Sequence, residues 1–227
     1  VSWDKESNQI NIMGNEQSMQ IARLECALAP KDTLEVVNSG AEAAKTRNGA
    51  WQYALMTPDL KKAYYEDFVS MNWCTGVSSP WIKGFEVKEL GKPDDNTYRY
   101  SVEFTWTDST NETTVGTDYV TVTNADGVWL ISRIGKLDVK GEITKVTPGS
   151  ESKAESIFVE GSKSSGATYD QANVLIGPET KIYQGNTDKE IKPQELKVGT
   201  KVEVVFKEGP MIMIYPPQAV AAEIRVF

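Results

Sequence analysis

The feature that most constrains the fold of this chain is a helical stretch, residues 32–81, which strands follow directly. Within this stretch, small and apolar residues recur at intervals of three and four positions, as they do on one face of a helix. Helices that lead into a run of strands predict an α+β domain, with the helices covering one side of a sheet. The residues on the helix faces are Leu34, Val37, Ala41 and Ala44, then Leu60, Ala63, Tyr64, Phe68 and Met71.

Capping residues mark where these helices start and break. Asp32 with Glu35 three positions later can form a capping box, and Thr57 before Pro58 is typical of an N-cap with proline in the first turn. The dipeptide Asn48-Gly49 interrupts the stretch. We therefore expect separate helices rather than one long helix.

Residues 98–107 predict the clearest strand, because apolar and polar side chains alternate along it. Strands are also expected at residues 85–90, 113–123 and 128–134, and Asn124 to Gly127 is a hairpin signal. The order predicts an antiparallel meander with one polar face. Along 98–107 one face carries Tyr98, Tyr100, Val102, Phe104 and Trp106, and the other carries Arg99, Ser101, Glu103, Thr105 and Thr107.

The sequence predicts three segments. Residues 1–31 are expected to be two short strands and a connector left from an upstream domain, residues 32–135 the α+β domain, and residues 136–227 an all-β domain. The last segment has no helical run and shows turn signals about every dozen residues. Its strands are expected at 139–147, 156–160, 173–176, 181–183, 201–206 and 219–226.

Residues 32–135 resemble the nuclear transport factor 2-like fold. The motifs that carry the resemblance are "EVVNSGAEAAKTRNGAWQYALMTPDLKKAYYEDF", then "GVSSPWI", and a final strand "DGVWLISRI". The resemblance is greatest to the version of this fold in uncharacterised secreted and lipoprotein chains of clostridia and bacilli. It implies a cone of helices over a curved antiparallel sheet, whose interior holds a ligand, a catalytic site or only core side chains.

Two further resemblances concern the ends of the chain. Residues 138–227, with "GEITKV" and "PQELKVGTKVEVVF", are similar to a small secreted β domain of unknown function in Gram-positive bacteria, and by pattern to oligonucleotide/oligosaccharide-binding-like barrels. Residues 1–12 resemble the end of the N-terminal stalk-type domain of copper amine oxidases, whose copper-bearing domain is not matched. These resemblances imply an extracellular or cell-envelope location. Because the chain opens at Val1 within an expected strand, a missing leader says nothing about compartment.

Composition excludes several classes of function. The chain has no histidine, which removes Ser-His-Asp and Cys-His catalysis and zinc sites that need imidazole. Its net charge is −8 without a Lys/Arg cluster, which argues against a nucleic-acid partner. No apolar run is long enough to span a bilayer. We expect no cofactor, no metal ion and no transmembrane segment.

The two cysteines, Cys26 and Cys74, leave two alternatives open. As a disulfide they would close a loop of about 48 residues, worth roughly 4 kcal/mol in the chain-entropy model. As free thiols, each would most often be a small buried hydrophobe. A catalytic thiol is not expected, because no histidine is available as its base.

Aromatic residues are dense between residues 51 and 129. One interpretation is an aromatic-lined pocket in the cone for a flat apolar or sugar ligand; the other is that the rings only pack helices against the sheet. The residues expected to line such a pocket are Tyr53, Tyr64, Trp73, Tyr98, Tyr100 and Trp106.

No catalytic residue is predicted. Glu66 and Asp67 belong to a solvated helix face, and Glu103 lies on the polar face of its strand. No carboxylate is recognised among apolar positions, so no perturbed pKa is expected. The acidic segments 94–96 and 108–112 lack the spacing of a calcium loop and predict hairpin turns.

The leading hypothesis is a non-enzymatic, secreted or cell-envelope bacterial module that binds or displays a ligand or partner, either a small ligand or a cell-surface protein or polymer. The competing hypothesis is a dehydratase- or isomerase-type enzyme that uses the cone pocket of residues 32–135. A carboxylate and a tyrosine that converge inside an open cavity would favour the enzyme. The apolar run within residues 209–218 predicts a buried strand or, if exposed, a docking site that could form oligomers.

Overall fold

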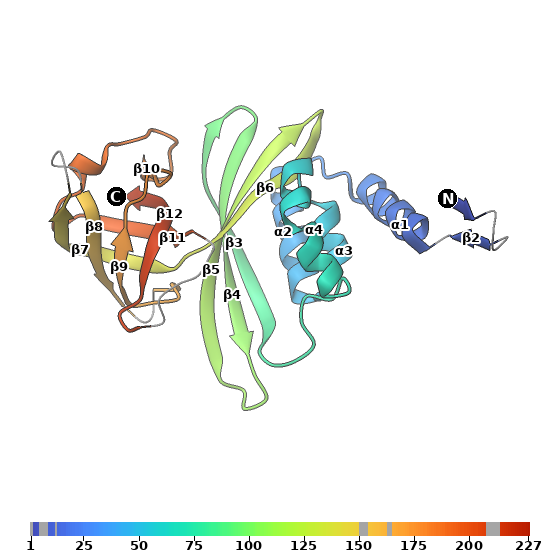
Figure 1. The fold of residues 1–227 in the computed structure, drawn as a ribbon, viewed down its shortest axis with the longest axis horizontal. Helices are drawn as coiled ribbons and strands as arrows, with labels where there is room; N and C mark the ends of the chain where they lie inside the picture. Colours follow the sequence, from blue (N-terminus) through green and yellow to red (C-terminus); the bar gives the residue numbers. More distant parts are fainter. Residues whose placement is uncertain (1, 5–8, 12, 150–153, 163–164, 208–213) are drawn as a thin grey trace. The chain divides into compact units, whose positions relative to one another are not determined.

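The computed structural model describes residues 2–4, 9–11, 13–149, 154–162, 165–207 and 214–227. It is a mixed α+β structure with four α-helices, a four-stranded sheet and a closed five-stranded barrel (Figure 1). The chain divides into two compact units, each discontinuous in sequence. The first unit contains residues 1–78 and 122–132, and the second contains residues 79–121 and 133–227.

The first unit is mainly helical. Helix α3 contacts α1, α2 and α4, so the short α3 is the centre of the helical packing. Ahead of the helices, β1 and β2 form an antiparallel pair, as residues 1–12 predicted. The elements are β1 (Ser2–Asp4), β2 (Gln9–Asn11), α1 (Met13–Leu28), α2 (Thr33–Lys45), α3 (Gly49–Ala54) and α4 (Pro58–Ser70).

The predicted helix starts are confirmed. Asp32 Oδ1 accepts hydrogen bonds from the backbone N–H of Leu34 (2.7 Å) and Glu35 (3.1 Å), which satisfies two donors that the first turn would leave unpaired. The carboxylate of Glu35 accepts from the N–H of Lys31 at 3.4 Å. Thr57 is the N-cap of α4 with proline in the first turn, although its side chain makes no capping hydrogen bond.

Helix α1 corrects the expectation of a connector at residues 13–31. Its residues are mostly good helix formers, but its apolar spacing is weak, so the periodic signal that identified the other helices is missing. Tertiary contact supplies what the pattern lacks. The helix packs against α3, and Glu25 forms an ion pair with Lys61 of α4.

A short piece of sheet completes the first unit. The backbone of Ile131 makes two hydrogen bonds to the residues that follow α3. Its N–H donates to Leu55 O, and its C=O accepts from Thr57 N–H, each at 2.8 Å. A Cβ on Gly40 would lie 2.8 Å from Ile131 Cδ1, so glycine allows α2 to approach this strand closely. Val36, Val37, Ala43 and Leu55 are fully or almost fully buried around it.

The four-stranded sheet has the order β3-β4-β5-β6 along the chain, as a meander does. The β5–β6 turn is the predicted hairpin: Gly127 has φ +86°, and its N–H donates to Asn124 Oδ1 at 2.9 Å. The first strand is much longer than the expected 85–90, because β3 continues through three register shifts against β4. The strands are β3 (Trp81–Asp94), β4 (Thr97–Thr107), β5 (Thr113–Ala125) and β6 (Val128–Lys136).

The barrel closes through the order β12-β11-β7-β8-β9, with β9 pairing back to β12, and β10 adds to β12 as a further parallel strand. Its core is aliphatic and includes Val139, Ile143, Ile157, Val174 and Ile224, each fully buried. All six predicted strands are present. They are β7 (Val139–Pro148), β8 (Ala154–Gly161), β9 (Gln171–Leu175), β10 (Lys181–Gln184), β11 (Lys201–Phe206) and β12 (Gln218–Val226), with a 3₁₀ turn at Pro193–Glu195.

Two glycines allow the backbones of β7 and β8 to approach each other closely. Gly141 and Gly161 lie opposite each other in the ladder. A Cβ on Gly161 would lie 1.8 Å from Lys140 O, and one on Gly141 would lie 2.0 Å from Glu160 O. No other residue fits either position without moving backbone.

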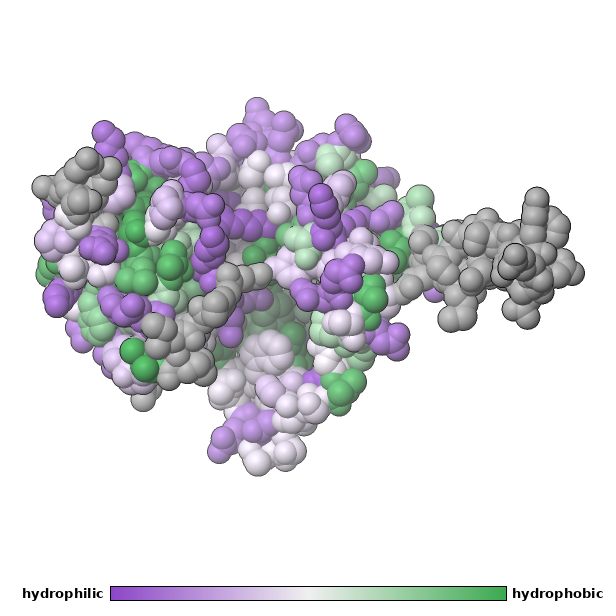
Figure 2. All heavy atoms as spheres, in the orientation of Figure 1, coloured by the Kyte–Doolittle hydropathy of each residue, from purple (hydrophilic) through white to green (hydrophobic). Residues whose placement is uncertain are grey.

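Hydrophilic residues cover much of the face in Figure 2, and hydrophobic residues appear in separate patches. Within the described part of the chain, no helix is long and apolar enough to cross a membrane. Of the apolar run at 211–215, residues 211–213 lie outside the described residues, whereas Ile214 and Tyr215 are 57% and 62% exposed.

The two compact units do not coincide with the expected domains at 1–31, 32–135 and 136–227. Strands β5 and β6 each run from one unit into the other, and residues 79–121 group with the barrel. The three expected domains remain a prediction about which parts fold alone.

Candidate functional site

The strongest candidate site is a cleft of about 810 Å³ in the second unit, which we call the aromatic cleft. It lies at one end of β4 and β5 and is bordered by the 166–168 loop. Its lining combines two aromatic rings, hydroxyl groups, one carboxylate and one ammonium group. The side chains that matter to the argument are Phe104, Trp106, Val115, Asp118, Lys136 and Thr168.

Strand alternation brings Phe104 and Trp106 to one face of β4 and Gly116 and Asp118 to one face of β5. Phe104 and Trp106 are two apart on β4, and their ring centroids lie 6.2 Å apart at 57°. On β5, Gly116 and Asp118 are also two apart. A Cβ on Gly116 would lie 3.5 Å from Trp106 Nε1, so the missing side chain leaves room for the indole beside β5.

The wall made by residues 166–168 is fixed to β5 by backbone hydrogen bonds. Thr117 N–H donates to Gly166 O at 3.0 Å, and Leu137 N–H donates to Thr117 O at 2.8 Å. Thr168 N–H then donates to Leu137 O at 3.1 Å. Gly166 has φ +76°, and a Cβ there would lie 2.7 Å from Thr117 Oγ1. The cleft is therefore built largely before any ligand arrives.

Asp118 is the unusual group in this cleft. Its carboxylate is partly buried and forms no hydrogen bond or ion pair with any residue that the structure describes. Desolvation raises its pKa to about 6; the nearby carboxylate of Asp138 acts in the same direction, and Lys136 opposes it. An unpaired, desolvated carboxylate that faces an open cleft is typical of a functional site.

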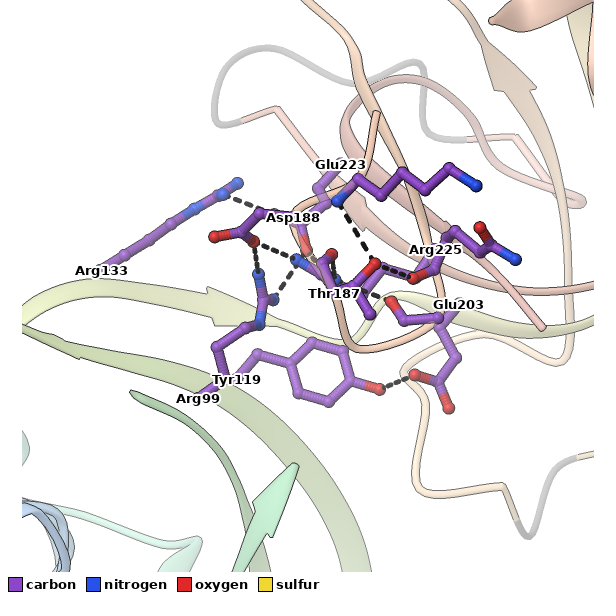
Figure 3. A network of polar contacts seen from close by, with 11 residues as sticks. Arg99, Tyr119, Arg133, Thr187, Asp188, Glu203, Glu223 and Arg225 are labelled. Atoms are coloured by element: carbon purple, nitrogen blue, oxygen red, sulfur yellow. Dashed lines mark hydrogen bonds and ion pairs between the residues drawn. The ribbon is translucent and has the colours of Figure 1, made fainter. Parts of the chain in front are cut away.

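A buried ionic network lies on the opposite strand faces of the same unit (Figure 3). Glu223 on β12 is its centre: Oε1 accepts from Arg99 Nη2 at 2.9 Å and from Arg225 Nε, and Oε2 accepts from Arg133 Nη1. Asp188 Oδ1 lies 3.7 Å from Arg99 Nη1 and 3.9 Å from Arg225 Nη2. Arg99, Glu223 and Arg225 are 6%, 3% and 1% exposed. The network joins β4 and β6 of the sheet to the barrel.

The network also shapes the loop that follows β10. Arg225 Nη1 donates to Gly185 O at 2.7 Å and to Thr187 O at 2.8 Å, and its guanidinium lies 4.8 Å from the ring centroid of Tyr183. Two buried nitrogens of the network, Arg99 Nε and Arg225 Nη2, have no hydrogen-bond partner among the described residues. Because both oxygens of the buried Glu223 carboxylate accept hydrogen bonds from arginines, we assign the network to folding.

Beside the network is a second cleft, of about 600 Å³, which we call the polar cleft. Tyr119 and Glu203 converge there: the phenol donates to Glu203 Oε2, and Lys140 Nζ lies 2.8 Å from Glu203 Oε1. Burial, and then the charge of Glu203, raise the pKa of Tyr119. A tyrosine and a carboxylate thus meet beside an open cavity. Both oxygens of the carboxylate are already occupied, however, which leaves little capacity for a substrate.

The six aromatic residues predicted to line a pocket are divided between the two units. In the helical unit, Tyr53 packs edge-on against Trp73, with centroids 5.2 Å apart, and Tyr64 is partly buried on α4. In the second unit, Tyr100 is 1% exposed and its hydroxyl donates to Glu89 at 3.4 Å.

Tyr98 lies under Lys92, with 5.6 Å between Nζ and the ring centroid. Of the six predicted residues, Trp106 lines the aromatic cleft.

Sequence reasoning missed Asp118, and its expectation that no carboxylate lies among apolar positions was wrong at this residue and at Glu223, which is 3% exposed. The signal was present. On β5 the alternation places Asp118 on the same face as Val120 and Val122, which are 7% and 0% exposed. The predictions for other acidic residues hold: Glu66, Asp67 and Glu103 are exposed.

The remaining predictions concern cysteines and cations. Cys26 and Cys74 are both free and exposed, which differs from the disulfide alternative and from the expectation of buried thiols. The acidic segment 108–112 is a turn, in which Asp108 Oδ1 accepts from Thr110 N–H at 2.8 Å. Within the described ranges, no group of three or more Cys, Asp or Glu side chains could hold a metal ion.

No known family model matches this sequence, and no curated protein matches it either. The function therefore has to be argued from the clefts themselves. Of the two, the aromatic cleft has a charged group without a partner, whereas the carboxylate at the base of the polar cleft is satisfied by its neighbours.

Proposed function

We propose that this chain is a non-enzymatic binding module of a secreted or cell-envelope bacterial protein, and that a small ligand occupies the aromatic cleft. In this proposal the helices and the four-stranded sheet form a nuclear transport factor 2-like cone, and residues 136–227 an oligonucleotide/oligosaccharide-binding-like barrel. The antiparallel meander and the five-stranded closure support the two assignments. The size of the cleft is within the usual range for small-ligand sites.

The observation that carries the proposal is the carboxylate of Asp118, which has no hydrogen-bond or ion-pair partner among the described residues and lines the same cleft as two aromatic rings. Folding has placed this charged group where water is scarce, and no described residue forms a hydrogen bond or ion pair with it, although Lys136 lies near enough to oppose part of the rise in its pKa. In a purely structural position this arrangement only destabilises the fold. A ligand that pairs with the carboxylate and covers the rings would account for this placement.

The test is a ligand screen by thermal shift on the whole chain and on two tryptophan variants. Trp106→Leu removes the larger ring of the aromatic cleft and should abolish the stabilisation by any ligand found. Trp81→Leu is the matched control, because Trp81 is 40% exposed and does not line this cleft. Equal stabilisation of wild type and Trp106→Leu by every ligand found would overturn the proposal.

One observation favours the alternative, a dehydratase- or isomerase-type enzyme. A carboxyl group with a pKa of about 6 could accept and return a proton near neutral pH. The described lining of the aromatic cleft offers no tyrosine as its partner, and for that reason we prefer binding. Exchange of α-protons of small ketones in deuterium oxide, present in wild type and lost in Asp118→Asn, would establish the enzyme instead.

A further inference from the structure

The charges around Asp118 are unbalanced. Asp118 is on β5, Lys136 is at the end of β6, and Asp138 directly precedes β7. Phe104 and Trp106 on β4 and the 166–168 loop add no charge. Lys136 is exposed, so water screens its ammonium group. The carboxylate of Asp138 is occupied, because its Oδ2 accepts from Phe206 N–H at 2.7 Å. Asp118 in the cleft lining and the nearby charge of Asp138 therefore stand against one screened base.

This balance decides the charge of the ligand. An anion would approach the carboxylate of Asp118, and the charge of Asp138 near it, with Lys136 as the one cation among the described lining residues. A neutral ligand would cover Asp118 and remove water from it without supplying an opposite charge, which is unfavourable. A cation would form an ion pair with the carboxylate of Asp118, and the faces of the Phe104 and Trp106 rings also attract positive charge.

We propose that the aromatic cleft selects a protonated amine joined to an apolar or aromatic body, with the ammonium group on Asp118 and the body against Phe104 and Trp106. The inference rests on the proposed function, since it names the class of ligand for the same cleft. Ammonium and carboxylate form a charge-assisted hydrogen bond, and the apolar body displaces water from the rings.

The inference includes a pH dependence with a defined sign. Asp118 binds the cation only when ionised, and its pKa of about 6 means that it becomes protonated as the pH falls through 6. We expect affinity to fall about tenfold between pH 7.5 and pH 5.0, as the ionised fraction does. The pKa of Asp138 is also raised, chiefly by desolvation, so its protonation acts in the same direction. Conversely, a bound amine should lower the pKa of Asp118.

The experiment uses four probes of similar size on the whole chain, measured by NMR titration at pH 7.5: phenethylamine, 2-phenylethanol, 3-phenylpropionate and phenylalanine. Phenethylamine should bind at least tenfold more tightly than 2-phenylethanol, and 3-phenylpropionate should bind most weakly of the probes. The substitution Asp118→Asn should reduce the affinity for phenethylamine to that for 2-phenylethanol. Asp126→Asn is the matched control, since Asp126 is exposed in the β5–β6 turn and should leave all four affinities unchanged.

The outcomes separate this inference from the proposed function. If 2-phenylethanol binds as well as phenethylamine and Trp106→Leu weakens both, the cleft binds ligands but the inference is wrong. Tighter binding of phenylalanine than of phenethylamine would also overturn it, because Lys136 would then select a carboxylate. If a wider screen finds no ligand whose binding depends on Trp106, the proposed function fails too. A second readout, the carboxyl ¹³C shift of Asp118, should report a lower pKa with saturating phenethylamine.

Discussion

Two carboxylates of the second unit are placed in opposite ways. Glu223 is 3% exposed and is surrounded by three guanidinium groups, whereas Asp118 is partly buried and no described residue pairs with it. The first arrangement stabilises the fold only while all its members are present. The second arrangement is unfavourable to the fold at neutral pH, a cost that the proposed ligand would offset.

For Asp118 the folded-state pKa of about 6 is above its ordinary value of 3.8. Its contribution to stability is therefore full below about pH 4 and is lost as the pH rises through 6. We expect Asp118→Asn to raise the free energy of unfolding by about 1–2 kcal/mol at pH 8 and to leave it unchanged at pH 4. Urea denaturation at both pH values measures this, with Asp126→Asn as control. A loss of stability at pH 8 would contradict it.

For Glu223 the expectation is the reverse. Glu223→Ala leaves Arg99 and Arg225 buried with only the distant Asp188 to offset their charge. It should lower the free energy of unfolding by about 3–5 kcal/mol. Glu179→Ala is the matched control: Glu179 pairs with Lys207 on the surface, with 77% of its side chain exposed, and should cost under about 1 kcal/mol. Equal effects of the two substitutions in urea denaturation would show that the network adds nothing.

At the scale of elements, the helices with caps and periodic apolar residues and all the barrel strands could be predicted from sequence. Helix α1 could not, because its apolar spacing is weak and its stability comes from contact with α3 and α4. The expected strand 85–90 was too short for the same reason: β3 is extended by pairing with β4, not by its own pattern.

The candidate site was predictable only in part. Trp106 was expected in a pocket because of its residue type and strand face, and it lines the aromatic cleft. Arg99 was placed on the polar face of its strand, but nothing in its neighbours indicates that Glu223, 124 positions later, buries it. Asp118 could have been recognised only by continuing the alternating pattern of β5 across an aspartate, a residue type that usually marks a turn.

The Gly141–Gly161 contact gives a prediction at this scale. Gly161→Ala puts a methyl group where Lys140 O lies, at 1.8 Å, so the β7–β8 ladder must separate there. We expect a loss of about 2 kcal/mol or more, since backbone has to move. Gly84→Ala is the control within another strand, because a Cβ on Gly84 meets nothing within 4 Å. Thermal unfolding of both variants measures the difference, and equal melting temperatures would contradict the expected clash.

For the whole molecule, the question is whether residues 136–227 fold alone. The barrel's Glu223 takes two of its three arginines, Arg99 and Arg133, from residues before 136. We expect an isolated 136–227 fragment to be less stable than the intact chain by about 3 kcal/mol or more, as for removal of one side of a buried ion pair. Urea denaturation of the fragment and of the intact chain measures this. Equal stability would establish the boundary that the sequence predicts near residue 135.

The closure of the barrel ring has a consequence for how the chain behaves beside copies of itself. Each of the five strands in the ring has partners on both sides, so the part of the ring that the structure describes offers other molecules no long row of free backbone donors and acceptors. Among the described residues, the four-residue β10 extends the ring beside β12, and its other side is bonded to residues 189–191, where Ile191 N–H donates to Ile182 O and Lys181 pairs with Glu190. Many copies of the barrel held close together on one surface should therefore not form fibrils by pairing of their strand edges.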